Sequence, residues 1–183
     1  MRVIAGSRKS LKLKTLEGNN TRPTNDRIKE TLFNMLGNDV NFCRFLDLFA
    51  GSGQIGIEAL SRGAESAVFV ENNRGCVDII KDNLKFTRFT EESKVIFKDV
   101  FTALAGNMVG NGFHIIFMDP PYAQHREDEA LKSIRENKIL AEDGFVIIEA
   151  DLERDFSFAE NLGFKIIKEK IYKTNKHVFL EEV

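Results

Sequence analysis

The feature that most constrains the fold is an alternation, from Phe45 onward, of short apolar segments with longer segments of helical periodicity. This alternation is typical of a parallel sheet with helices on both faces, because the central strands of such a sheet are buried on both sides. We therefore predict an α/β fold. The predicted strands are 45–49, 66–70, 94–98, 113–118 and 144–149, and the predicted helices are 54–62, 73–86, 126–137 and 153–162.

The last two apolar segments break this alternation. Segments 164–171 and 176–182 are joined by only four residues, too few for a crossover helix. We predict that they form an antiparallel hairpin that completes a seven-stranded, mostly parallel sheet. Gly63 and Gly163 each follow a predicted helix, at a position where a left-handed residue commonly ends one.

A basic segment precedes the α/β core. Residues 2–5 and 11–15 are predicted to pair as a small hairpin. A helix should begin near Thr24, whose hydroxyl can cap it, with Asp26 in its first turn. Its apolar stripe consists of Ile28, Leu32 and Met35. We expect one domain, 1–183, with an N-terminal appendage over 1–36 and the core over 37–183.

Composition narrows the class of protein. With 43% hydrophobic and 30% charged residues, the chain is expected to be globular and not disordered. Cys43 and Cys76 share no metal-ligand spacing and are expected to be small apolar fillers. No segment resembles a signal peptide, and no 18 apolar residues follow one another. We expect a monomeric cytoplasmic protein with no metal ion and no membrane contact.

A glycine-rich turn follows the first predicted strand. Gly51, Gly53 and Gly56 have the spacing of a turn at which a ligand approaches the backbone at a helix N-terminus. Glu71 ends the next strand 20 residues after Gly51, where a carboxylate can bind the two hydroxyls of a ribose. This pattern alone fits a nicotinamide-dependent dehydrogenase about as well as a methyltransferase.

Two further carboxylates favour the methyltransferase. Asp47 lies inside the first strand, where a dinucleotide-binding strand is usually apolar, and Asp99 closes the third strand. The carboxyl ends of parallel strands converge on one crevice. Together with Glu71, these acids suit a ligand with an ammonium group, a ribose and an adenine amine better than one with a pyrophosphate. A single acid at the end of a strand is more often a helix cap, so the inference depends on the set.

The fourth predicted strand ends in Asp119-Pro120-Pro121-Tyr122. Consecutive prolines cannot continue a sheet, so the chain leaves the strand at its carboxyl edge. The carboxylate of Asp119 and the carbonyl of Pro120 can accept both hydrogens of an exocyclic base amine, and Tyr122 can stack on an extruded base. We therefore interpret the four residues as a catalytic centre for N-methylation; the alternative is an ordinary proline loop with a surface tyrosine.

With these residues, the chain resembles class I S-adenosylmethionine-dependent methyltransferases of Rossmann-like fold. It is most similar to the bacterial small-subunit ribosomal RNA methyltransferase D family, which N2-methylates one guanine of 16S rRNA. The motifs that carry the resemblance span nearly the whole chain: Arg2-Val3-Ile4-Ala5-Gly6, the segment from Arg22-Pro23-Thr24 to Phe33, Asp47 to Gly53, and Asp119 to Tyr122.

The resemblance implies a role for each matching position. The methionine end of the cofactor is expected beside Arg22, Thr24, Asp47, Gly51 and Gly53. Glu71 is expected to bind the ribose hydroxyls with Asn72 next to it, and Asp99 to accept the adenine amine. Asp119, Pro120, Pro121 and Tyr122 are expected to hold the target guanine.

The partner implied by the resemblance is 16S rRNA or the assembling small ribosomal subunit. Net charge is only −2, but five cations precede the first acid, Glu17. We expect this basic arm to contact RNA phosphates, although a solvated hairpin face would have the same composition. Its cations are Arg2, Arg8, Lys9, Lys12 and Lys14.

Four other functions remain open. A dehydrogenase would leave Asp119 to Tyr122 unexplained. Adenine-N6 methylation fits the same four residues, but a DNA enzyme usually carries a larger target-recognition domain than 183 residues allow. Glutamine methylation more often has asparagine at the position of Asp119. A non-catalytic RNA-binding module would not need the motifs intact.

Overall fold

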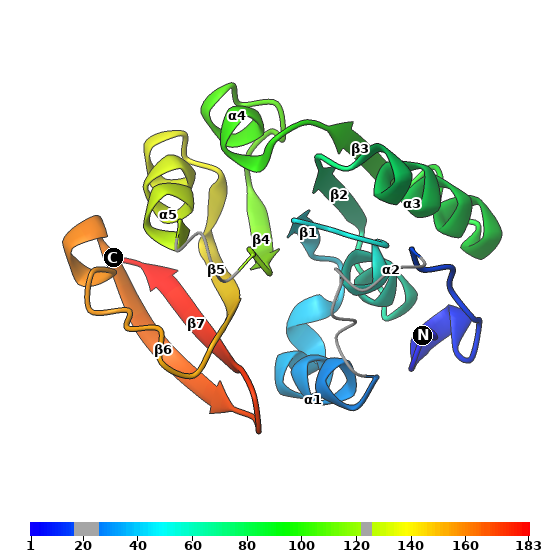
Figure 1. The fold of residues 1–183 in the computed structure, drawn as a ribbon, viewed down its shortest axis with the longest axis horizontal. Helices are drawn as coiled ribbons and strands as arrows, with labels where there is room; N and C mark the ends of the chain where they lie inside the picture. Colours follow the sequence, from blue (N-terminus) through cyan, green and yellow to red (C-terminus); the bar gives the residue numbers. More distant parts are fainter. Residues whose placement is uncertain (17–25, 122–125) are drawn as a thin grey trace.

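The structure is a computed structural model that describes residues 1–16, 26–121 and 126–183 (Figure 1). A seven-stranded sheet in the order β3-β2-β1-β4-β5-β7-β6 forms its centre. The first five strands are parallel, and β7 pairs antiparallel with both β5 and β6. The strands are β1 (Arg44–Leu48), β2 (Ser66–Glu71), β3 (Ser93–Phe97), β4 (Phe113–Met118), β5 (Leu140–Ala150), β6 (Phe164–Ile171) and β7 (Lys176–Glu182).

The predicted α/β fold is confirmed, including the antiparallel hairpin of β6 and β7. Each predicted strand lies within one residue of the observed one, except β5, which begins four residues earlier than predicted. The early start pairs Leu140 with Phe113, and a register shift follows before Ile115 pairs with Phe145. Short apolar segments therefore located the strands, whereas the irregular pairing at the start of β4 could not be predicted from them.

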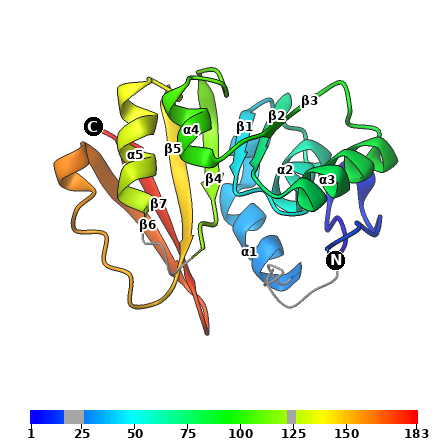
Figure 2. The same cartoon turned by 45° about the horizontal axis from the view of Figure 1, so that its top comes forward.

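Helices cover both faces of the sheet, as Figure 2 shows for α4 and α5 on one side and α1 on the other. Buried residues of α4 and α5 pack on one face, and those of α1, α2 and α3 on the other. The sheet is thus the middle of three layers, which explains why its central strands are apolar on both sides. The helices are α1 (Asp26–Leu36), α2 (Gln54–Ser61), α3 (Arg74–Thr87), α4 (Val100–Ala105) and α5 (Glu127–Glu136).

Local capping sets several helix ends. The Asn73 side chain accepts a hydrogen bond from the backbone N–H of Cys76 and so begins α3. Asp99 accepts one from Thr102 and begins α4, a six-residue helix that we had not predicted. Gly163 has φ +76° and caps a short 3-10 helix, Glu160–Leu162, so its left-handed conformation is as predicted. Gly63 also has a positive φ, of +106°, two residues after α2 ends.

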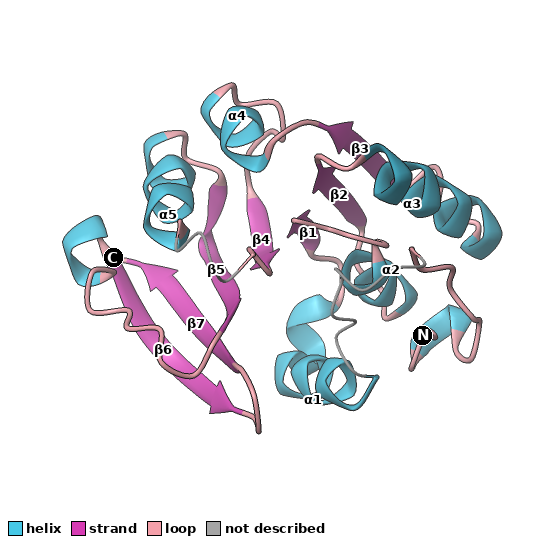
Figure 3. Cartoon of the chain, in the orientation of Figure 1, coloured by secondary structure: helices cyan, strands magenta, loops and turns pink. Residues whose placement is uncertain are grey.

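The predicted helix over 153–162 is wrong. Residues 151–159 form turns, and only Glu160–Leu162 is helical (Figure 3). The carboxylate of Asp155 accepts hydrogen bonds from both the backbone N–H and the hydroxyl of Ser157. Such local side-chain bonds compete with a helical backbone and favour a turn.

The N-terminal arm, residues 1–16, packs against the core instead of extending from it. Arg2 and Lys12 pair antiparallel around a 3-10 turn, Gly6–Arg8, so the predicted hairpin is present in a shorter form. Val3 and Leu13 are buried in the same apolar cluster as α1 and α2. Leu32 of the predicted stripe in α1 is fully buried, whereas Ile28 and Met35 are only partly buried.

Within residues 1–16, 26–121 and 126–183, none of the helices combines the length and apolar character needed to cross a membrane. The same residues contain no cluster of three metal-ligating side chains.

Candidate active site

The candidate site lies where the strand order reverses. β1 is the first strand in the sequence and lies between β2 and β4 (Figure 1). The chain adds β2 and β3 on one side of β1 and then crosses over to add β4 and β5 on the other side. In an open α/β sheet, ligands bind in the crevice at the carboxyl end of the strands at such a point. The glycine-rich turn follows β1, and the Asp119 motif follows β4 at the same edge.

The glycine turn is tightly folded. Phe49, Gly51 and Gly53 all have positive φ, of +59°, +54° and +76°. The backbone N–H of Gly53 donates to the carbonyl of Ala50, and the N–H of Ala50 donates to Val70 of the neighbouring strand. The turn therefore directs the chain from β1 into α2 within five residues.

Two of its glycines differ in their surroundings. A Cβ on Gly56 would lie 2.3 Å from the ring of Phe69, so glycine here lets α2 pack closely against β2. A Cβ on Gly51 would meet no atom within 4 Å, so the backbone is open on that side. Open space beside a turn at a helix N-terminus is what a bound ligand requires. The turn therefore fits a cofactor that approaches the backbone at Gly51.

Asp47 is a buried carboxylate at the base of this turn. Its side chain is 2% exposed, and its Oδ2 accepts a hydrogen bond from the backbone N–H of Gly56 at 2.9 Å. Burial raises the pKa of Asp47 to about 8; the Gly56 bond opposes the rise, and the negative charge of Glu71 adds to it. A cationic ligand group near Asp47 would stabilise the ionised form.

Glu71 is held in place by the backbone. Its two carboxylate oxygens accept hydrogen bonds from the N–H groups of Gly51, Asn72 and Asn73, at 2.8 to 2.9 Å. The bond to Gly51 connects the end of β2 directly to the glycine turn. Asn72, predicted to lie near the cofactor, is exposed at the end of β2.

Asp99 caps α4 and lies at the same edge of the sheet. Its carboxylate is bonded to Thr102, as expected of an acid at a strand end. Two aromatic rings lie close by, since Phe101 of α4 contacts Phe49 of the turn with ring centroids 6.1 Å apart. The guanidinium of Arg126 lies 3.5 Å from the centroid of the Phe101 ring. The end of β3 is thus partly polar and partly aromatic.

The Asp119 motif lies directly beside the glycine turn. Leu48 of β1 and Met118 of β4 are paired in register, so the next residues along the two parallel strands are Phe49 and Asp119. Asp119 is partly exposed, Pro120 is buried and Pro121 is exposed. Tyr122, and the predicted cofactor residues Arg22 and Thr24, lie outside the described residues.

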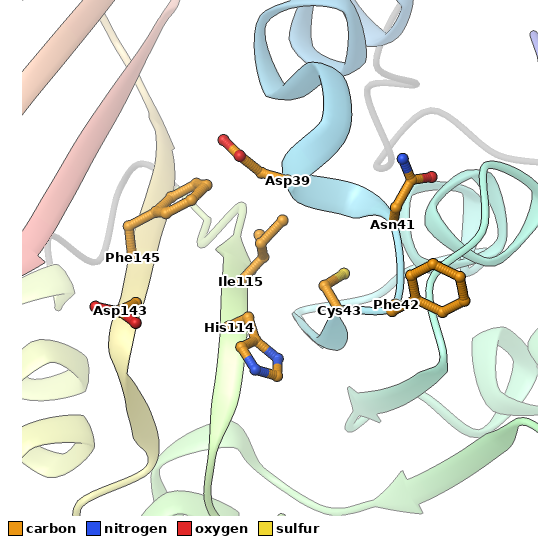
Figure 4. Close-up of a pocket in the computed structure, with 8 residues that line it drawn as sticks. All are labelled: Asp39, Asn41, Phe42, Cys43, His114, Ile115, Asp143 and Phe145. Atoms are coloured by element: carbon orange, nitrogen blue, oxygen red, sulfur yellow. The ribbon is translucent and has the colours of Figure 1, made fainter.

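A separate cavity of about 200 Å³ lies at the opposite, amino-terminal edge of the sheet (Figure 4). Its lining includes Phe42, Cys43, His114 and Asp143, which precede or begin their strands. Burial raises the pKa of the Cys43 thiol to about 12, so the thiol is protonated and unreactive at neutral pH. Because neither the glycine turn nor Asp119 borders this cavity, it is not the cofactor crevice.

Comparison with known proteins agrees with this geometry. Residues 1–181 match the family model described as conserved hypothetical protein 95. The chain is 43% identical over 171 residues to YlbH of Bacillus subtilis, a candidate rRNA methyltransferase, covering 93% of this chain and 92% of that protein. It is 33% identical to the ribosomal RNA small subunit methyltransferase D of Haemophilus influenzae, over 93% of this chain and 88% of the relative. The chain belongs to this methyltransferase D family.

Solved structures support the same assignment. The Escherichia coli protein yhhF superposes with a TM-score of 0.88 and 30% identity, covering all of this chain and 97% of the other. The chain is therefore a class I methyltransferase of Rossmann-like fold, and its cofactor is S-adenosylmethionine. Hydrogen bonds connect Glu71 to Gly51 and Asp47 to Gly56, so both acids contact the glycine turn and the start of α2.

The cations of the basic arm differ in how far they are already engaged. The guanidinium of Arg8 donates to the carbonyl of Thr87 and lies over the ring of Phe89, so it attaches the arm to α3. Lys14 forms an exposed ion pair with Asp82, and Arg2 lies 3.5 Å from Asp26. Lys9 and Lys12 are exposed and form no ion pair with any residue that the structure describes.

One polar group at this edge, Glu149, was not among the predicted site residues. It lies near the end of β5, buried against Asn175 and His177. A signal was available, because β1, β2 and β3 also carry an acid at or just beyond the carboxyl end, and Glu149 continues this series. Its partners in the hairpin could not be predicted without the pairing of β5 with β7.

Proposed function

We propose that the protein transfers a methyl group from S-adenosylmethionine to the N2 amine of a guanine in 16S rRNA, at a site of the guanine-966 type. The observation that carries the proposal is the register of β1 with β4, which brings Asp119 and the glycine turn to neighbouring positions. The names of the relatives from Haemophilus influenzae and Escherichia coli support small-subunit rRNA as the substrate class.

The target amine is a weak nucleophile, because its lone pair is delocalised into the base. Asp119 would accept one amine hydrogen through its carboxylate, and Pro120 the other through its carbonyl. This holds the nitrogen lone pair toward the methyl donor, and orientation of this kind can contribute about 7–11 kcal/mol to catalysis. Tyr122 would stack on the extruded guanine, which is worth about 1–3 kcal/mol per base.

The cofactor supplies an electrophilic methyl group on a sulfonium. Asp47 would face its ammonium group together with Arg22 and Thr24 at the methionine end. Glu71 and Asn72 would bind the ribose, and Asp99 the adenine amine beside the Phe49 and Phe101 rings. The hydrogen bond between Glu71 and Gly51 and the open space beside Gly51 support this arrangement.

The basic arm would bind the phosphates of the RNA near the target base. Lys9 and Lys12 are the best placed of its five cations, because both are exposed and unengaged among the described residues, whereas Arg8 mainly anchors the arm. We propose that residues 1–183 act as one monomeric unit on rRNA or on the assembling small subunit, in the cytoplasm.

Product analysis tests the proposed reaction. The protein would be incubated with labelled S-adenosylmethionine and small-subunit particles that lack the modification, and the rRNA nucleosides then separated by mass. We expect N2-methylguanosine; labelled N6-methyladenosine, or label only in protein, would contradict the proposal and support the corresponding alternative.

The Asp119→Ala variant tests the catalytic centre. We expect methyl transfer to slow by roughly 10²–10³-fold, the usual loss when one preorganised polar contact to the reacting group is removed. Binding of S-adenosylhomocysteine, followed by thermal shift, should remain, since Asp119 contacts the base and not the cofactor. An Asp119→Ala enzyme with the normal rate would exclude the proposed mechanism.

A further inference from the structure

A buried polar network connects the C-terminal hairpin to the carboxyl edge of β5. The two carboxylate oxygens of Glu149 are engaged separately: Oε1 accepts from Nδ2 of Asn175 at 2.6 Å, and Oε2 lies 3.1 Å from Nε2 of His177. The hydroxyl of Tyr172 lies 3.1 Å from the other ring nitrogen, Nδ1. Glu149 is 5% exposed, Asn175 4% and His177 0%.

The directions of these hydrogen bonds follow from chemistry. A carboxylate only accepts, so Nε2 of His177 carries a hydrogen; in the neutral imidazole, Nδ1 then accepts from the hydroxyl of Tyr172. Burial and the negative charge of Glu149 raise the pKa of Tyr172 to about 12, so its hydroxyl stays protonated and can donate. The amide of Asn175 and Nε2 of His177 both donate to Glu149, which favours a charged carboxylate.

Glu149 lies beside Asp119. Met118 of β4 and Ile148 of β5 are paired in register, and both strands run in the same direction, so Asp119 and Glu149 occupy the next pair of positions. Neighbouring strands lie about 4.8 Å apart. The residue before a proline is biased toward extended backbone, so we infer that the side-chain alternation of β4 continues through Asp119.

Both side chains face the same side of the sheet. Phe117 and Ile147 belong to the apolar cluster on the α1 face, and two positions further along their strands are Asp119 and Glu149. His177 belongs to the same face, since its ring lies edge-on to Phe117 with centroids 6.0 Å apart. Three adjacent strands, β4, β5 and β7, therefore bring Asp119, Glu149 and His177 together.

The side-chain amide of Asn175 is a second observation that points to a functional polar site. Its Oδ1 is buried and has no hydrogen-bond partner among the described residues. Turning the amide round would place that oxygen against the Glu149 carboxylate, which is unfavourable, so the orientation is set by Glu149. Unpaired buried acceptors are uncommon and often accompany a function.

We propose that Glu149, anchored by Asn175 and His177, is a second anionic residue of the active centre, which stabilises the positive charge that methyl transfer places on the target amine. As the C–S bond of the sulfonium breaks and the N–C bond forms, the positive charge passes from sulfur to the amine nitrogen. That nitrogen then loses one proton to a carboxylate or to water. A fixed negative charge beside Asp119, shielded from solvent, lowers the energy of the charged nitrogen. This proposal rests on the proposed amine methylation.

The decisive comparison is between Glu149→Gln and Glu149→Asp. Glutamine keeps the length of the side chain and loses the charge, whereas aspartate keeps the charge and shortens the side chain. If the charge matters, single-turnover methylation of unmodified small-subunit particles should fall roughly 10–100-fold for Glu149→Gln and less for Glu149→Asp. Affinities for the particle and for S-adenosylhomocysteine should stay within about twofold of the wild type for both variants.

Glu142→Gln is the matched control, because it makes the same change at the exposed amino-terminal end of the same strand; its rate should not change. A Glu149→Gln rate within twofold of the wild type, or one equal to or above that of Glu149→Asp, would overturn the proposal. If Glu149→Gln does not fold, Asn175→Ala carries the test, since it removes one anchor from the turn between β6 and β7. A wild-type rate there would also overturn the proposal.

The result is separable from that of the proposed function. Wild-type product that is not N2-methylguanosine contradicts the substrate assignment, yet the order of the two Glu149 variants still measures the effect of the charge. Correct wild-type product with equal rates in the variants contradicts only the role of Glu149.

Discussion

Two buried carboxylates, one within helix α2 and one bonded to its first turn, have very different hydrogen-bond and ion-pair partners. Glu58, inside the helix, is fully buried and accepts hydrogen bonds from the backbone N–H groups of Ile4 and Ala5 and from Nε of Arg62. Nζ of Lys29, itself fully buried, lies 3.6 Å away. Asp47, below the first turn of the same helix, accepts a hydrogen bond from the backbone N–H of Gly56 and has a raised pKa.

The difference separates a carboxylate that stabilises the fold, Glu58, from one that is available to a ligand, Asp47. At Glu58, two cations and two amides compensate the burial of one charge and attach the N-terminal arm and α1 to α2. At Asp47, the protein provides too little compensation to keep the carboxylate ionised at neutral pH without a ligand. We infer that a fully paired buried acid holds the fold together, whereas an under-paired one beside an open turn binds a cation.

The largest expected effect is on stability at Glu58. Glu58→Gln removes the nearest counter-charge of the buried Lys29, and breaking a buried pair in this way costs about 3–5 kcal/mol in free energy of unfolding. Urea unfolding measures the loss. Adding Lys29→Met should restore part of it, because the uncompensated charge is then gone.

Glu65→Gln is the control for that prediction, because Glu65 is exposed in the loop between α2 and β2. It should change stability by less than about 0.5 kcal/mol. If Glu58→Gln were as stable as this control, the comparison of the two carboxylates would be wrong.

Asp47→Asn should change how stability depends on pH. The pKa of Asp47 is about 8 in the folded protein and about 4 in the unfolded chain, so between these values the folded state binds more protons. The stability contributed by this group is fully present below pH 4 and is lost as the pH rises to about 8, by at most about 1.4 kcal/mol per pH unit. Asp47→Asn lacks this loss, so its stability relative to the wild type should increase from pH 5 to pH 8.

Ligand affinity tests directly whether Asp47 binds a cationic group. S-adenosylhomocysteine carries an ammonium group, and its affinity for the wild type should rise with pH up to about 8 as Asp47 ionises. Asp47→Asn should bind it more weakly, with a flatter pH dependence, in isothermal titration. Equal affinity and equal pH dependence in the two proteins would remove Asp47 from the cofactor site.

Gly6→Ala tests whether the docking of the N-terminal arm on α2 requires close backbone packing in addition to the hydrogen bonds of Glu58. Gly6 has φ +82°, and a Cβ there would lie 1.8 Å from the backbone oxygen of Ser61, which cannot move away easily. We expect a loss of about 1–3 kcal/mol in urea unfolding, with faster proteolysis of the arm. Gly37→Ala is the control, since φ is also positive there but an added Cβ would meet no atom within 4 Å. An equal loss of stability at Gly37 would mean that the positive φ alone causes the effect.

The smallest effect is expected from the arm cations. Replacing Lys9, Lys12 and Lys14 by glutamine should reduce the slope of log affinity for rRNA against log salt by about 2, at about 0.7 per phosphate contact. The ion pair of Lys14 with Asp82 makes a value nearer 1.4 expected if only Lys9 and Lys12 contact phosphate. Replacing Lys165, Lys168 and Lys170 of β6 is the control, and an equal change there would mean that the arm has no special role.

Much of the candidate site could be predicted, because its residues lie at strand ends that the sequence pattern locates. Gly51, Asp47, Glu71 and Asp119 lie at or near strand ends, and the carboxyl ends of parallel strands meet at one edge whatever their order. Periodicity could not exclude the helix over 153–162, because it does not register the hydrogen bond that Ser157 donates to Asp155, which competes with a helix locally. Glu149 was missed because its importance depends on His177, 28 residues away.

By itself, the sequence determined the alternation of strands and helices, the glycine turn and the acids near it, because each depends on residues close together in the chain. Only the tertiary structure decided that Asp119 lies beside Phe49, that Glu149 is anchored by the last hairpin, and that Glu58 holds the basic arm. These relations arise from strand order and register and from contacts between distant residues. No local pattern of residues specifies them.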